Sequence, residues 1–217
     1  MLSADAIVEL HDRETRAWHQ KPPGPNDASP APVAASDVAE GWLHSVARQH
    51  RANFDLWHIE DEARTPGATD ADLAAVKRRI DRTNQLRNDL VEELDSTLLK
   101  WLEPRGLPNP AAPLNSESPS LIIDRLSILA LKIYHTREEA ERTNAPPGHA
   151  ERNRDRLALL VVQRTDLACC LDALWNETIS GKRRFKLYRQ LKMYNDPSLN
   201  PAIYRNLPGR VSDHGNS

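Results

Sequence analysis

The chain has 217 residues, of which 28% are charged, and its formal net charge is −2. This length suits one domain that buries about 70% of the surface of the unfolded chain, and the balanced charge argues against a nucleic-acid-binding protein. No run approaches the ~18 apolar residues of a membrane-spanning helix, and residues 1–20 lack the apolar core of a signal peptide, so we expect no membrane span.

The first part of the chain predicts two helices joined by a linker. Apolar residues recur at helical spacing in residues 4–19, which predicts a short amphipathic helix. Residues 21–36 are rich in Pro, Ala and Ser and predict an extended linker. Asp37 with Glu40 three residues later resembles a capping box, and the second helix is expected to continue to about Arg64.

Three further long helices are expected at residues 69–102, 118–142 and 149–180. Thr69 and Asp72 form a second start signal, and Gly181 is placed to end the last long helix in the left-handed conformation. A short basic helix, residues 183–193, is expected to follow. We find no convincing strand pattern.

These elements predict an all-α fold, an antiparallel bundle of four long helices with a short N-terminal helix and a short basic C-terminal helix. The expected parts are an N-terminal helix (1–20), a proline-rich linker (21–36), a helical bundle domain (37–205) and a disordered tail (206–217). The short end helices are expected to be peripheral to the bundle.

The helix expected at residues 118–142 is apolar on nearly every side. One face is wholly apolar, while Ile128 and Leu131 share the opposite face with Asp124 and His135. A solvated face would not usually carry this mixture, so we predict that this helix is central and packed on both sides. Asp124 and His135 would then lie partly out of water and need partners.

The other long helices also carry ionisable residues within their apolar stripes. The signs match, with Asp61 and Asp124 against Arg87 and Arg164, and histidines able to take either role. One interpretation is a buried network that fixes helix register. Another is a polar-lined ligand pocket in the bundle centre. A third is that the helical wheel misplaces these residues and that they face solvent.

In the pocket interpretation, Asp124 and His135 are the candidate catalytic residues, because both can transfer protons. A guanidinium would hold a carboxylate or phosphate of the ligand. The candidate ligand-binding residues are Asp61, Arg87, Lys132, Arg164, Arg184 and Arg189. No cofactor is indicated by the sequence.

A metal site is the less favoured interpretation. Di-metal bundles use Glu-x-x-His ligand pairs, and this sequence contains none. Asp55-x-x-His58 and His135-x-x-Glu138 would each place two ligands on one helical face, but Asp55 and His58 lie on the more polar side of their helix. We therefore predict solvated side chains at Asp55 and His58, and no metal.

Residues 182–192 form the strongest local charge feature, with six basic side chains and no acidic residue before Asp196. Interleaved with Phe185 and Tyr188, these side chains could clamp a phosphate-bearing ligand or dock on an anionic surface. The alternative is a solvated helix whose charge is balanced elsewhere in the chain.

Cys169 and Cys170 are adjacent in a helical stretch. Neighbouring cysteines do not readily form a disulfide with each other, and their spacing does not suit zinc. We predict two buried thiols in a reducing compartment, which indicates the cytoplasm.

Four stretches together resemble a bacterial family known as domain of unknown function 4254. They are residues 53–64, 77–89, 123–135 and 184–201, and the resemblance covers roughly residues 40–204. It implies no catalytic residue. Members of that family are often encoded beside glycosyltransferases, which implies glycan or sugar-phosphate metabolism by association alone.

We therefore expect a cytoplasmic helical-bundle protein that binds an anionic small molecule, such as a phosphorylated sugar or a nucleotide sugar, in its polar-lined centre. Its expected partners are that molecule and a protein of a glycosyltransferase pathway, with no nucleic acid. An enzyme of glycan or natural-product assembly and a homo-oligomer both stay open. The alternative is a non-catalytic helical adaptor whose basic C-terminal helix docks on a partner protein or an anionic surface.

Overall fold

The structure is a computed structural model that describes residues 2–22 and 38–191. Its helices are α1 (Ala4–Gln20), α2 (Val38–Glu62), α3 (Asp70–Leu102), the 3-10 turn η1 (Glu103–Arg105), α4 (Pro119–Glu141) and α5 (His149–Ile179). The described residues contain no strand, only an isolated bridge between Leu114 and Arg184. The all-α prediction is confirmed. Most of the expected linker and the whole expected tail lie outside the described residues.

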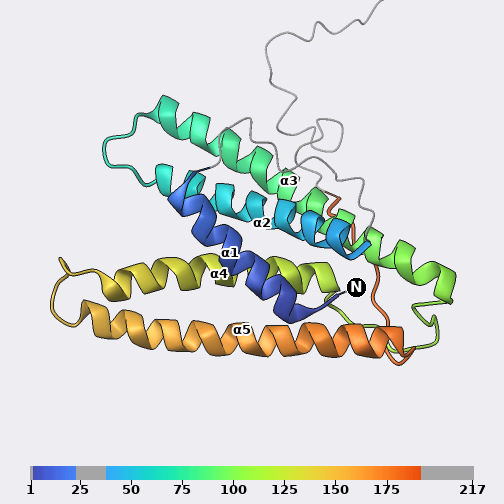
Figure 1. Ribbon diagram of the computed structural model, residues 1–217. Coiled ribbons are helices and arrows are strands. Elements are labelled where there is room, and N and C mark those ends of the chain that lie inside the picture. Colours follow the sequence, from blue (N-terminus) through green and yellow to red (C-terminus); the bar gives the residue numbers. More distant parts are fainter. Residues whose placement is uncertain (1, 23–37, 192–217) are drawn as a thin grey trace, which may run out of the picture. The chain divides into compact units, whose positions relative to one another are not determined.

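The long helices pair as two antiparallel hairpins, α2 with α3 and α4 with α5, and α1 lies across them (Figure 1). Helix α4 packs against each of the other four α-helices. Its two faces are both buried, including Leu126 on one side and Leu131 on the other. The predicted central position of this helix is therefore confirmed. None of the helices in the described ranges is long and apolar enough to cross a lipid bilayer.

Helix α1 belongs to the core and is not peripheral. Ile7 and Leu10 are buried in the same hydrophobic cluster as residues of the four long helices. The backbone N–H of Ala4 donates to Asp172 Oδ1 of α5 at 3.0 Å. The described residues up to 187 accordingly form one compact unit that includes α1, and residues 188–191 belong to a second.

The predicted start of α3 and end of α5 are confirmed, whereas the predicted cap of α4 is not. The start signal predicted at Asp37 lies outside the described residues. Thr69 and Asp72 form the expected capping box, and Gly181 has the expected left-handed conformation, with φ of +72°. At the start of α4, however, the Ser118 hydroxyl makes no capping hydrogen bond. Asp95 of α3 accepts from the backbone N–H of Ser120 at 3.0 Å instead. Burial raises the pKa of Asp95, and hydrogen bonds from Ser118 and Ser120 oppose that rise.

The expected basic helix is not present in residues 182–191, which are not helical. The Arg184 N–H donates to the Pro113 carbonyl at 3.0 Å, and Arg184 accepts from the Asn115 N–H at 2.7 Å. Phe185 is 1% exposed and belongs to the core cluster. Pairing with the loop before α4 and burial of Phe185 hold this segment extended. Residues 192 and 193 of the expected helix lie outside the described residues.

Both cysteines are exposed, so the prediction of buried thiols is wrong. Helix α5 packs chiefly on α4 and α1, which leaves its outer side in solvent. Cys169 and Cys170 lie on that outer side.

Candidate functional site

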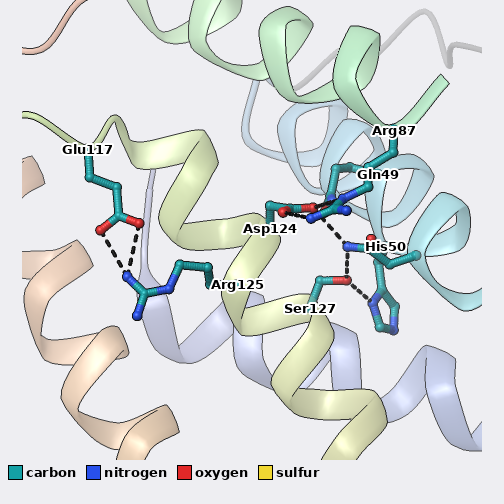
Figure 2. Close-up of polar contacts among 8 residues, drawn as sticks. Gln49, His50, Arg87, Glu117, Asp124, Arg125 and Ser127 are labelled. Atoms are coloured by element: carbon teal, nitrogen blue, oxygen red, sulfur yellow. Dashed lines mark hydrogen bonds and ion pairs between the residues drawn. The ribbon is translucent and has the colours of Figure 1, made fainter. Parts of the chain in front are cut away.

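Asp124, in the second turn of α4, is buried and accepts hydrogen bonds from three side chains (Figure 2). Arg87 of α3 donates from Nε to Oδ1 at 2.8 Å and from Nη2 to Oδ2. Gln49 and Asn53 of α2 donate to Oδ1 at 2.6 and 3.0 Å. These donors offset the cost of removing the carboxylate from water. The same ion pair raises the pKa of Arg87, against the effect of burial.

The polar network continues from Asp124 to helix α1. The Asn53 amide donates to Ser127 Oγ at 2.9 Å, and His50 Nδ1 shares a 2.7 Å hydrogen bond with the same hydroxyl. His50 Nε2 lies 2.9 Å from Thr15 Oγ1. Side chains of α1, α2, α3 and α4 are thus joined in one network, and Arg87 meets Asp124 inside the protein as their apolar stripes predict.

His50 and His11 are buried where the network reaches α1, and both rings are neutral. Burial lowers the pKa of His50 to about 3. His11, with its ring centroid 4.4 Å from that of His50, has its pKa lowered well below the ordinary value, first by burial and then by repulsion from His50 and Arg164. Among the described residues, neither ring nitrogen of His11 has a hydrogen-bond partner.

A pocket of about 370 Å³ lies beside the Arg87–Asp124 pair, and we call it the Arg87 pocket. It is lined by Asn53, Leu56, Trp57, Glu60, Asp61, Arg64, Arg87, Ile128 and Leu131. Its apolar residues come from α2 and α4. Its charges are mixed, because Glu60 and Asp61 accompany the two arginines, and Arg87 is already paired with Asp124.

A second pocket, of about 390 Å³, also has Trp57 in its wall, and we call it the Lys132 pocket. It is lined by Trp57, Lys132, His135, Thr136, Glu139, Asn153, Arg156, Leu159 and Leu160. Within the described part of the chain, neither Lys132 nor Arg156 forms an ion pair. Glu139 is bonded by His149 Nε2 at 2.8 Å. The lining therefore carries two unpaired cations and an acid that is already engaged.

His135 also belongs to a group of three imidazoles, the histidine trio of His19, His58 and His135. One nitrogen of each ring lies within 4.8 Å of those of the other two. The His135 ring stacks on Trp57 at 5.0 Å, and its Nδ1 lies 3.0 Å from Glu138 Oε2. Burial lowers the pKa of His135, and the bond to Glu138 opposes that shift. Among the described residues, these three side chains form the group that could hold a metal.

The prediction of a solvated His58 is wrong, because α1 brings His19 against it and leaves it half-buried. Asp55 is 40% exposed and pairs with Arg51 at 2.7 Å, so it does not join the trio.

Several predicted site residues lie elsewhere than expected. Arg164 pairs with Asp12 of α1 at 2.8 Å, not with an acid of the long helices, because α1 lies against α5. Asp61 is exposed, because it lies beyond the last buried residue of α2. Its Oδ1 lies 3.7 Å from Arg64 Nη1. Lys132 is exposed and lines the Lys132 pocket from the surface, not from the protein centre.

Arg184 and Arg189, the predicted ligand-binding arginines of the basic segment, line neither the Arg87 pocket nor the Lys132 pocket. Arg184 Nε donates to the Ala112 carbonyl at 2.8 Å and anchors the loop before α4. Arg189 is exposed and belongs to the second compact unit.

Gln49, Trp57 and His19 are not among the site residues predicted from the sequence. Gln49 was detectable, since it precedes Asn53 by one helical turn and shares its face. Trp57 lies in the apolar stripe of its helix, which predicts a core residue, yet it lines both pockets. No sequence signal marks His19, because its position beside His58 depends on how α1 docks.

A family model described as "Protein of unknown function (DUF4254)" matches residues 43–187. The matched range contains the Arg87–Asp124 pair, the Arg87 pocket and the Lys132 pocket. It also contains His58 and His135, while His19 precedes it. No curated protein and no solved structure matches the chain.

Proposed function

The chain belongs to the DUF4254 family, and from this premise we propose that it binds an anionic small molecule in the Lys132 pocket, with Trp57 as the wall for a ring of the ligand. The observation that carries the proposal is the pair of cations, Lys132 and Arg156, that line one pocket without an acidic partner in the described chain. Unpaired cations beside an aromatic wall suit a phosphate joined to a sugar or a base.

The Arg87 pocket is the weaker candidate for the anion. Arg87 is occupied by Asp124, and Glu60 and Asp61 would repel a phosphate. We assign the Arg87–Asp124 pair the role of fixing how α3 and α4 pack.

The candidate ligands are phosphorylated sugars and nucleotide sugars. Support comes from the association of the family with glycosyltransferases, which also makes an enzyme of glycan or natural-product assembly the first activity to test. If chemistry occurs, His135 is the candidate for proton transfer, because its ring lines the pocket and its Nε2 is unpartnered among the described residues. Asp124 is the weaker candidate, since its carboxylate is occupied by its donors. Two exposed, unpaired thiols suit the reducing cytoplasm.

A thermal-shift screen against sugar phosphates and nucleotide sugars tests this function, with calorimetry and Trp fluorescence on the hits. We expect Lys132→Met and Arg156→Met to remove the ligand-induced rise in Tm. Both residues are exposed, so the unliganded protein should change by no more than about 0.5 kcal/mol. Lys100→Met, an exposed lysine of α3 outside both pockets, is the matched control. A screen without hits, or binding that survives both pocket variants, contradicts the proposal.

The adaptor alternative now depends on an extended segment in place of the expected helix. Lys182 and Lys186 are exposed there, while Arg183 and Arg184 bond to Glu177 and the Ala112 carbonyl. Replacing Lys182 and Lys186 by Gln should make capture of a partner weaker and less dependent on salt if the adaptor function holds.

A further inference from the structure

We propose that His19, His58 and His135 bind a transition-metal ion, with zinc the best fit, at a site that joins α1, α2 and α4. The trio offers one nitrogen from each ring within 4.8 Å of the other two. Imidazole nitrogen suits zinc, copper, nickel and iron, whereas magnesium and calcium prefer oxygen ligands. The trio shares His135 with the Lys132 pocket. Binding of the ion itself does not rest on the anion-binding function, because neither Lys132 nor Arg156 belongs to the trio, and with the ion bound His135 Nε2 would be a ligand and not a proton-transfer group.

The hydrogen bonds of the trio engage Nδ1 of each ring, which leaves Nε2 as the nitrogen that a metal would take. His19 Nδ1 bonds to the Thr15 carbonyl at 2.7 Å, and His58 Nδ1 bonds to the Phe54 carbonyl at 2.8 Å. A carbonyl oxygen only accepts, so both Nδ1 atoms carry the proton. His135 Nδ1 is directed to the Glu138 carboxylate. Metal-binding histidines characteristically donate their second N–H to a carbonyl or a carboxylate in this way.

The opposite nitrogens of two of these rings have nothing else to bind. Nε2 of His19 and Nε2 of His135 are buried and lack a hydrogen-bond partner within the described residues. A buried polar atom without a partner is unfavourable, because it has lost its hydrogen bonds to water and gained none in the protein. A metal ion bound by both lone pairs removes this cost.

The spacing requires a modest closure on binding. Zinc–nitrogen bonds of about 2.0–2.1 Å in a tetrahedral site place the nitrogens about 3.3 Å apart. Nitrogens at the outer limit of 4.8 Å would therefore approach by about 1.5 Å. Such a shift is within the reach of small ring rotations on three separate helices.

The group found in the described chain has three ligands, all histidines. Three protein ligands with a fourth position open is the arrangement of catalytic zinc sites, whereas structural zinc has four protein ligands. His135 also lines the Lys132 pocket. A zinc ion here would supply a Lewis acid or a metal-bound water to a molecule in that pocket.

The competing explanation is that the trio only fills space between helices. His19 stacks on Tyr134 with centroids 4.1 Å apart, and its ring edge meets Phe54. Aromatic packing of this kind needs no metal and predicts no stoichiometric binding, so the two explanations differ in a measurable way.

The test is a zinc titration of the full chain, without a polyhistidine tag, in competition with a chromophoric chelator. We expect one zinc per chain with a Kd of about 1 µM or tighter. His19→Ala, His58→Ala and His135→Ala should each weaken binding at least about 100-fold, because each removes one of three ligands. His44→Ala, a half-buried histidine of α2 outside the trio, should bind like the native chain.

A pair of glutamate variants separates a metal site from general damage to the fold. Glu138→Gln should weaken zinc affinity about 10-fold at unchanged stoichiometry, while Glu141→Gln, an exposed acid of the same helix, should have no effect. Cobalt added to the native chain should give the visible absorption of a low-coordinate nitrogen site. This measurement uses no variant, so it does not depend on whether a variant folds. Zinc binding weaker than about 100 µM, native affinity in His58→Ala, or a cobalt spectrum like that of the free aqueous ion would each overturn the proposal.

Discussion

Arg87 of α3 lies against Asp124 of α4 in a bidentate pair, with Nε 2.8 Å from Oδ1. The side chain of Asp124 is 9% exposed and that of Arg87 is 24% exposed. The pair joins one helical hairpin to the other, and the amides of Gln49 and Asn53 complete the set of donors to Asp124. Its charge and shape both restrict how α3 can lie on α4.

Removing one partner of this pair should destabilise the fold strongly. Arg87→Met leaves the buried Asp124 carboxylate without its cation, and we expect the free energy of unfolding to fall by about 3 kcal/mol. Urea denaturation measures this loss. Combining Arg87→Met with Asp124→Leu should recover much of it, because an apolar pair leaves no uncompensated charge.

The control for this experiment is Glu62→Gln, which breaks the exposed ion pair with Arg79. Its cost should stay below about 1 kcal/mol. Equal losses in Arg87→Met and Glu62→Gln would mean that burial of the Arg87–Asp124 pair is unimportant for stability.

Acid should destabilise the protein before most carboxylates titrate. The pKa of His50 is about 3 in the folded chain, against an ordinary value of 6.5. Below pH 6.5 the unfolded chain takes up a proton that folded His50 excludes, so stability present above pH 6.5 is lost as the pH falls toward 3. The slope reaches about 1.4 kcal/mol per pH unit for each such histidine, and His11 should add to it.

Urea midpoints at pH 7, 6 and 5 measure this slope, and His50→Gln should reduce it. A midpoint that stays constant from pH 7 to pH 5 in the native chain would contradict the neutral, buried state of these two rings.

Helix α1 should be necessary for full stability, although it precedes the family match at residues 43–187. Ile7 is fully buried in the common core cluster. Ile7→Ala should lower the free energy of unfolding by about 2–5 kcal/mol through the cavity that it leaves. Glu9→Ala, on the exposed side of α1, should change stability by less than about 0.5 kcal/mol. A neutral Ile7→Ala would show that α1 does not stabilise the rest of the unit.

Both thiols should be reactive in the native protein. Cys169 and Cys170 are exposed on α5, so a chromogenic disulfide reagent should modify two thiols per chain without denaturant. Circular dichroism should show unchanged helicity, because neither side chain belongs to the core. Protection of either thiol until the chain unfolds would place that part of α5 in an interface.

The sequence by itself determined helices α1 to α5 and the general place of each along the chain, but it also predicted a basic helix that residues 182–191 do not form. Periodicity located α1 to α5, the Thr69–Asp72 capping box marked the start of α3, and Gly181 marked the end of α5. These signals are local, since they depend on neighbours within a few residues. For the same reason the wheel of α4 sufficed to predict a helix buried on both sides.

Only the tertiary structure decided which side chains meet. A helical wheel assigns a residue to a face and does not say which other helix covers that face. Arg164 therefore found Asp12 of α1, and Asp95 of α3 capped α4. The histidine trio likewise depends on α1 docking on α2 and α4, because His19 is close to His58 and His135 in space and distant from both in sequence.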